Sequence, residues 1–175
     1  MRIVVGAGHT SYPGWLPTNR ATLDLLRRED FARHWQPGTR AVFLAEHVFE
    51  HLSEDDGRRA AAQCFEFLRA GGRLRIAVPD GLNPDPAYRE AVRPGGSGPG
   101  ADDHKMLYTA ASLQASLESA GFRCELLEYW DERGDFHAGD WSPDDGKIVR
   151  SRRFDPRNAD GALRYTSLIA DGIKP

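Results

Sequence analysis

Three short apolar runs, in which polar residues do not alternate, set the fold class of this 175-residue chain. They are Arg2–Val5, Ala41–Ala45 and Leu74–Val78. Runs of this kind are typical of strands that are buried on both faces of a parallel sheet. Between the second and third runs, apolar residues at helical spacing predict a helix that Ser53 caps and Gly71–Gly72 ends. Strand, helix and strand in this order predict parallel strands joined by right-handed crossovers and covered on both sides.

The second half of the chain adds one more helix and two more strands. The pattern predicts a helix over Ala110–Ala120, with Thr109 as its cap and Gly121 at its end. The apolar runs Cys124–Tyr129 and Leu163–Ala170 predict the strands. We therefore expect an α/β fold: a single-domain, Rossmann-like, mostly parallel sheet with flanking helices over residues 1–175.

Two segments lack a regular pattern. Residues 80–104 are rich in proline and glycine, and a loop of this length in a compact domain usually covers a binding site, so we call it the lid segment. Residues 131–160 are irregular and dense in charge, and we call them the excursion. Its histidine, His137, and its arginines Arg150, Arg152 and Arg153 could bind an acidic substrate group or a partner subunit, or form pairs with neighbouring aspartates.

Composition narrows the class of function. The chain is 40% hydrophobic and 28% charged, with a formal net charge of −3, which argues against binding to nucleic acid or to an anionic membrane. It has no apolar stretch of the roughly 20 residues that a membrane span needs and no signal-peptide pattern, so we expect a cytoplasmic protein that acts on a small molecule. Cys64 and Cys124 lack metal or redox spacing and are expected to be core thiols.

The carboxyl ends of the predicted parallel strands define one rim. Ligands of open α/β sheets bind there, which places residues 6–15, 45–51 and 79–85 around a single site. Gly6 and Gly8 allow a ligand to lie directly against the backbone. The turn is neither a Walker loop nor a good dinucleotide motif, because no Lys-Ser/Thr follows and the next glycine is Gly14.

Three segments together carry a family resemblance. Gly6-Ala7-Gly8 with Pro13-Gly14-Trp15, then AEHVFEHL at residues 45–52, then LRAGGRLRIAVPD at residues 68–80 resemble the class I S-adenosylmethionine-dependent methyltransferases, in particular the short type 11 group. Tyr108, Leu113 and the run Ala120-Gly121-Phe122 resemble the helix before that family's sixth strand. The resemblance covers roughly residues 1–130. It implies an antiparallel last strand at Leu163–Ala170, and relative to the family the N-terminal half of this chain is shortened.

The resemblance also implies a cofactor and a reaction. S-adenosylmethionine would donate a methyl group to a small-molecule acceptor. The residues implied to bind the cofactor are Gly6, Ala7, Gly8, His9, Trp15, Ala45, Glu46 and His47. The sequence departs from the family at the end of the second strand, where an acidic residue normally binds the ribose and where Leu16–Asn19 has no acid. The stretch between Gly8 and Thr39 is also shorter than the usual strand, helix and strand.

Four residues are candidates for catalysis. His104 could act as a general base, with Asp103 orienting it, and Asp80 and His47 could contact the substrate at strand ends. A solvated turn at Asp103–His104 and a plain turn at Asp80 remain open alternatives.

Rival functions follow from two of these features. The missing acid allows a non-catalytic relative that has lost the cofactor. The segment His47–His51 also matches HxxEH, the motif of inverted zinc hydrolases, which on a helix would place both imidazoles on one face with Glu50 as a base. Because the resemblance already accounts for this segment, we expect no metal site. A shortened sheet leaves an edge that a second copy could cover, so a homodimer is one arrangement that it allows.

Overall fold

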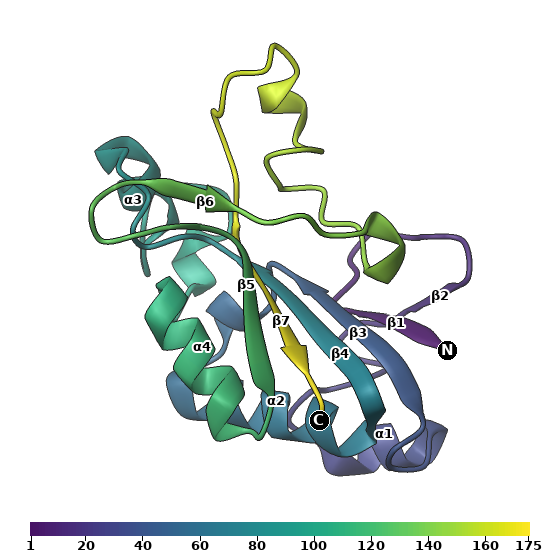
Figure 1. Cartoon of the computed structure of the whole chain (residues 1–175). Helices are drawn as coiled ribbons and strands as arrows, with labels where there is room; N and C mark the ends of the chain where they lie inside the picture. Colours follow the sequence, from purple (N-terminus) through teal and green to yellow (C-terminus); the bar gives the residue numbers. More distant parts are fainter.

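The computed structural model describes residues 1–175 as a seven-stranded sheet in the order β2-β1-β3-β4-β7-β5-β6 (Figure 1). The strands β2, β1, β3 and β4 pair in parallel, and β4, β7, β5 and β6 pair in antiparallel fashion. The bounds are β1 Arg2–Val5, β2 Trp15–Pro17, β3 Arg40–Glu46, β4 Leu68–Val78, β5 Arg123–Trp130, β6 Phe136–Ala138 and β7 Leu168–Ile173. The predicted α/β fold with an antiparallel last strand is confirmed.

Four helices accompany the sheet: α1 Arg28–His34, α2 Glu54–Phe67, α3 Pro86–Val92 and α4 Ala110–Ser119. Ser53 caps α2 by accepting from the amide of Asp56, and Thr109 caps α4 in a reciprocal pair with Ser112, as the sequence predicts. Short 3₁₀ turns lie at Phe49–His51, Ala101–Asp103, Pro143–Asp145 and Pro156–Asn158. None of the helices is long and apolar enough to cross a membrane.

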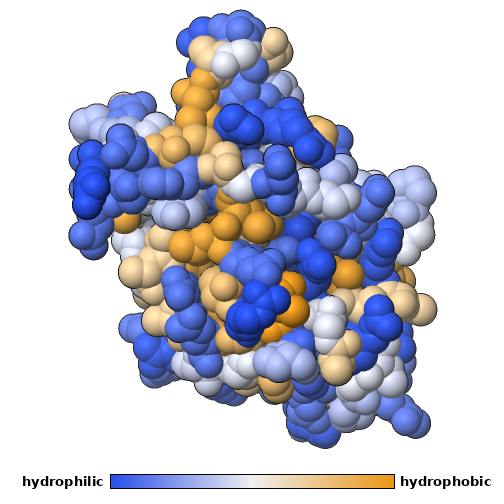
Figure 2. All heavy atoms as spheres, viewed as in Figure 1, coloured by the Kyte–Doolittle hydropathy of each residue, from blue (hydrophilic) through white to orange (hydrophobic).

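The two faces of the sheet are covered differently. The larger core joins one face to α1, α2 and α4 through buried residues such as Phe31, Cys64 and Leu117. The second face has a smaller core around Leu44 and Ile169, which loop residues and the excursion cover in place of helices. The sheet is thus covered on both sides, as expected, with the helices packed on one face and irregular segments on the other. Figure 2 shows apolar residues gathered in the middle of the visible surface and a mostly hydrophilic surround.

Both cysteines belong to the larger core. Cys64 is fully buried, Cys124 is half-buried against it, and neither forms a disulfide. Burial raises the pKa of both thiols, to about 12 for Cys124, where nearby carboxylates add to the effect.

The last strand starts later than the sequence pattern suggests. β7 spans Leu168–Ile173, whereas the apolar run predicts Leu163–Ala170. The amides of Arg164 and Tyr165 both donate to the Oδ1 atom of Asn158, so this part of the chain is bound to the end of the excursion and is not a strand. Because these two amides bind a side chain, they do not take part in strand pairing, and β7 begins after them.

The N-terminal half is short because a helix is missing. Residues 6–14 form a loop between β1 and β2, and β2 has three residues that pair with Arg2–Val4. Leu16 and Pro17 are exposed on this edge strand. The segment around Asp24, whose pattern looks helical, is a turn in which Asp24 Oδ1 accepts from the amide of Leu26.

Candidate functional site

A cavity of about 820 Å³ lies at the carboxyl ends of β1, β3 and β4. The turn after β1, the residues after β3 and Pro79 after β4 form its floor, and the lid segment and the excursion form its walls. In Figure 1 this is the edge of the sheet beside α3, below the green-to-yellow excursion. The three rim segments thus converge on one cavity, as expected for parallel strands.

The glycine turn after β1 opens into this cavity. Gly6 and Gly8 have φ values of +60° and +54°, which glycine adopts without strain. A Cβ atom at Gly6 would lie 2.5 Å from Cγ2 of Val48, whereas one at Gly8 would meet nothing within 4 Å. The amide groups of Gly8 and His9 donate to no other group of the protein. Successive free amides in a tight turn form a site for an anionic group.

The carboxyl end of β2 carries no acidic side chain. Thr18 donates from both its amide and its hydroxyl to the carbonyl of Val4, and Asn19 Oδ1 accepts from the amide of Ala21. The acid that the family pattern places here is therefore absent from the three-dimensional site as well as from the sequence.

Glu46 lies at the end of β3 and holds the excursion over the cavity. Its two carboxylate oxygens accept from the amides of Val149, at 3.1 Å, and Arg150, at 2.7 Å. Glu46 lines the cavity, but both of its carboxylate oxygens are taken up by these contacts with loop backbone.

His47 lines the cavity in an unusual backbone conformation. Its φ of +56° is the only positive value outside glycine, and Phe49–His51 is a 3₁₀ turn. The helix that would put His47 and His51 on one face is absent, so the HxxEH interpretation is wrong. His47 Nε2 lies 2.9 Å from the Ser167 hydroxyl, and Nδ1 lies 2.9 Å from Oε1 of Glu50.

His104 and Asp103 do not form the pair that the sequence suggests. His104 lines the cavity, and its Nδ1 atom lies 2.7 Å from the carbonyl of Val92. Donation from Nδ1 leaves the lone pair on Nε2, which suits a base or a ligand. The exposed Asp103 lies outside the cavity lining, 3.3 Å from Nδ1 of His51. The expectation that Asp103 orients His104 is wrong.

Three other predicted site residues lie outside the cavity. Asp80 is fully buried, and its oxygens accept from the amides of Leu82 and Trp130, so it anchors the end of β5. Burial raises the pKa of Asp80 despite these two hydrogen bonds. Ala45 faces the larger core. Trp15 packs edge-on against Tyr12, under the guanidinium of Arg2.

The cavity also contains residues that sequence reasoning did not place there. Tyr88 of the lid segment and Tyr165, which follows the excursion, pack with ring centroids 5.4 Å apart. Burial raises the pKa of Tyr88 well above its usual value. No sequence signal identifies either tyrosine: Tyr88 lies on the short helix α3, which the sequence pattern does not predict, and Tyr165 lies in an irregular segment.

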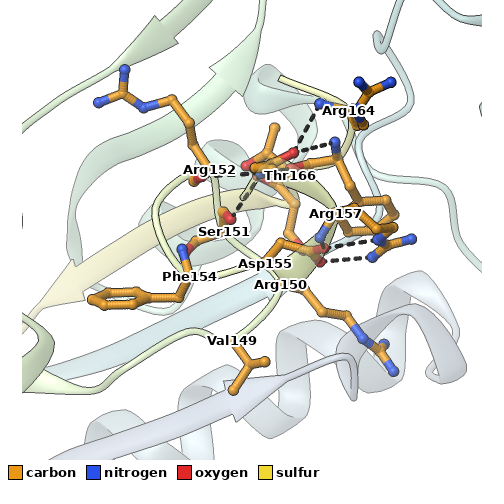
Figure 3. A network of polar contacts seen from close by, with 12 residues as sticks. Val149, Arg150, Ser151, Arg152, Phe154, Asp155, Arg157, Arg164 and Thr166 are labelled. Atoms are coloured by element: carbon orange, nitrogen blue, oxygen red, sulfur yellow. Dashed lines mark hydrogen bonds and ion pairs between the residues drawn. The ribbon is translucent and has the colours of Figure 1, made fainter. Parts of the chain in front are cut away.

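Three arginines complete the wall on the excursion side: Arg150, Arg157 and Arg164. Arg157 binds both oxygens of Asp155 and lies over the ring of Tyr165, and Arg164 pairs with Asp160. Figure 3 shows the two contacts between Arg157 and Asp155 and the guanidinium of Arg150, which forms no ion pair. Arg150 thus presents a free positive charge at the cavity.

Comparisons with known proteins identify the fold. No protein-family model matches the chain, and no curated protein matches it significantly in sequence. Among solved structures, it is similar to a methyltransferase of Archaeoglobus fulgidus that depends on S-adenosylmethionine (SAM). The TM-score is 0.54 at 13% identity, covering 97% of this chain and 83% of that one.

Two further solved structures have the same fold. A SAM-dependent methyltransferase of Thermotoga maritima, described as a possible histamine N-methyltransferase, matches with a TM-score of 0.60 at 12% identity, covering 99% of this chain and 81% of that one. Magnesium protoporphyrin IX methyltransferase of Synechocystis, with bound S-adenosylhomocysteine, matches with a TM-score of 0.52 at 10% identity, covering 100% and 74%. The chain therefore has a methyltransferase-like fold.

Proposed function

We propose that this chain is a SAM-dependent methyltransferase that acts on a small-molecule acceptor. The observation that carries the proposal is the glycine turn at the end of β1, whose free amides face a cavity of about 820 Å³. Small-molecule sites usually have volumes of roughly 300–1,000 Å³. The fold is that of proteins solved with S-adenosylhomocysteine in place.

The residues of the turn fit the amino-acid end of the cofactor. The amides of Gly8 and His9 would take its carboxylate, and the open space above Gly8 lets that group approach the backbone. The bound cofactor would supply an activated methyl group. The protein would hold the acceptor in line with it, which can remove roughly 7–11 kcal/mol of entropic barrier.

The remaining polar groups favour an anionic acceptor. Arg150 lines the cavity and has no carboxylate partner, whereas the charges of Arg157 and Arg164 are balanced by Asp155 and Asp160. An arginine fork recognises carboxylate and phosphate groups in two-point contacts. Nε2 of His104, with its free lone pair, would take the acceptor's proton where the acceptor needs one removed.

Calorimetric titration with SAM and S-adenosylhomocysteine tests the proposal. We expect binding of both at one site per chain, and no heat of binding up to millimolar concentration would overturn it. Gly8→Asp puts a carboxylate beside the free amides and should abolish binding. Gly14→Asp is the matched control, because Gly14 also has a positive φ and open space but lies outside the cavity.

The absence of an acidic side chain at the end of β2 favours one alternative. In this alternative the chain is a methyltransferase-like binding module that has lost the cofactor. Thr18 and Asn19 occupy the position where related folds place the ribose-binding acid. This alternative predicts no rise in melting temperature with either cofactor form. A ligand at about 100 times its dissociation constant stabilises a protein by roughly 2.7 kcal/mol, so a clear thermal shift would reject it.

A further inference from the structure

Three side chains with metal-ligating atoms converge on the floor of the cavity. Glu50 and His51 come from the 3₁₀ turn after β3, and His104 comes from the end of the lid segment. One ligand atom from each lies within 4.8 Å of the other two. The group was not expected from the sequence, because the lid segment supplies one of its members.

Glu50 is a buried carboxylate without a hydrogen bond. Its side chain is fully buried, and neither oxygen has a hydrogen-bond partner. Nδ1 of His47 lies 2.9 Å from Oε1, but the two groups are not aligned for a hydrogen bond. A carboxylate in this position is costly unless a positive charge or a set of donors compensates it.

A second polar atom of the cluster is unsatisfied in the same way. Nδ1 of His51 is buried and forms no aligned hydrogen bond, although Oδ2 of Asp103 lies 3.3 Å away. The rings of His51 and His104 lie edge to face, with centroids 4.9 Å apart. Two imidazoles beside one unpartnered carboxylate is an arrangement that a cation would satisfy.

The backbone holds His104 in this place. The carbonyl of Glu50 accepts from the amides of Lys105, at 2.7 Å, and Met106, at 3.1 Å, which ties the end of the lid segment to the turn after β3. The carbonyl of Val92 accepts from Nδ1 of His104, which leaves Nε2 free. Metal-binding histidines are usually oriented by a hydrogen bond of this kind from the other ring nitrogen.

We propose that Glu50, His51 and His104 form a binding site for a divalent transition-metal ion, for which Zn²⁺ is the best match. Two imidazoles and one carboxylate suit zinc, whereas Mg²⁺ and Ca²⁺ prefer oxygen ligands alone. Zinc ligands lie about 2.0–2.2 Å from the metal, so the three atoms must approach one another by roughly 1 Å. Rotations of the three side chains would supply this movement.

The metal site shares His104 with the proposed methyl transfer: an ion bound there would occupy Nε2 of His104, which would then not act as the base. Three protein ligands leave one position of the ion open toward the cavity, where an oxygen or nitrogen atom of a bound molecule would complete the coordination. The ion would compensate the charge of Glu50 and would fix the lid segment to the rim of the sheet. His47 is not a member of the cluster, although its Nδ1 atom lies close to Oε1 of Glu50.

Titration of the full chain with ZnCl₂, after chelator treatment and dialysis, tests the site. We expect one Zn²⁺ per chain, and a visible absorption band when Co²⁺ takes its place. His104→Ala should weaken Zn²⁺ binding by more than tenfold, since changes to groups behind the ligands alone cost roughly 10–100-fold. His9→Ala is the matched control, because His9 lines the same cavity outside the cluster, and its Zn²⁺ affinity should equal that of the wild type.

Absence of stoichiometric binding by the wild type would overturn the site, and so would equal affinity in the wild type and His104→Ala. Glu50→Gln is a second variant, and a circular dichroism spectrum shows whether it folds. In a folded Glu50→Gln protein the rise in melting temperature that Zn²⁺ gives the wild type should disappear. If the rise persists unchanged, Glu50 is not a ligand and the proposal fails. The readouts are metal binding and stability, so they are independent of methyltransferase activity.

Discussion

Arg75 on β4 and Asp171 on β7 form a fully buried, two-point ion pair, with Nε–Oδ1 and Nη2–Oδ2 distances of 2.7 and 2.8 Å. The third nitrogen of Arg75 donates to the carbonyls of Ser142 and Gly146, and Trp141 lies against the guanidinium with its ring centroid 5.0 Å away. One arginine therefore joins the antiparallel half of the sheet to the excursion, on the face that no helix covers.

Asp171→Ala is expected to lower the free energy of unfolding by about 3–5 kcal/mol, because it leaves the Arg75 charge buried without compensation. Urea denaturation followed by circular dichroism measures the loss. Glu125→Ala is the control, since Glu125 pairs with Arg123 on the exposed surface and its loss should cost less than about 1 kcal/mol. Equal losses in the two variants would contradict the structural role of the buried pair.

Glu46→Gln should loosen the excursion. The glutamine amide offers one acceptor, so one of the amides of Val149 and Arg150 loses its partner, at a cost of roughly 1–3 kcal/mol. Local opening is then expected to rise about tenfold, and trypsin should cleave faster at Arg150, Arg152 and Arg153. Glu132→Gln, an exposed change without such contacts, should leave the cleavage rate unaltered. Unchanged cleavage in Glu46→Gln would show that other contacts hold the excursion.

The two glycines of the cofactor turn should respond differently to alanine. Both have positive φ, which costs a residue with a side chain roughly 1–2 kcal/mol. Only at Gly6 does the new methyl group also collide with Val48, which adds roughly 1–3 kcal/mol of overpacking. Melting curves should therefore place Gly6→Ala clearly below Gly8→Ala. The reverse order would mean that the turn does not pack on Val48 as described.

The parts of the fold that the sequence predicts are those with local signals. β1, β3 and β4 are short buried runs, and α2 and α4 have good caps and a regular apolar spacing. β2 is a three-residue edge strand with two exposed residues, which leaves no periodicity to detect. α1 has only two buried positions, Asp30 and Phe31, and its N-terminus has no side-chain cap.

The residues of the site can be separated in the same way, into those that local sequence signals predict and those that they do not. Gly6, Gly8, Glu46 and His47 were predicted to meet because each follows a strand, and all four line the cavity. The partners of His104 were not predictable, since they depend on how the lid segment folds against the turn at Phe49–His51. Tyr88 on the short helix α3, Arg157 in a 3₁₀ turn and Tyr165 in a loop reach the cavity from segments for which the sequence pattern predicts no regular element, so the pattern does not indicate where their side chains point.

Acid should weaken the excursion through Asp155. Burial raises the pKa of this carboxyl, but hydrogen bonds from the side chain and amide of Arg157, together with its charge, outweigh burial and hold the pKa below its usual value. The unfolded chain then binds the proton at a higher pH than the folded chain does. The stabilisation is therefore complete above the ordinary aspartate pKa of about 3.9 and is lost as the pH falls through the lower pKa of the folded state.

Asp155→Asn should accordingly be less stable than the wild type at pH 7, by a difference on the order of 1 kcal/mol, and this difference should shrink as the pH falls below about 4. Denaturation curves at pH 7, 5, 4 and 3 measure it. Asp140→Asn is the control, because Asp140 is exposed and forms no ion pair, so its difference from the wild type should stay near zero throughout. A constant difference for Asp155→Asn at all four pH values would mean that Arg157 does not act on the Asp155 carboxylate. Its packing over Tyr165 would then be the contact that holds this wall of the cavity.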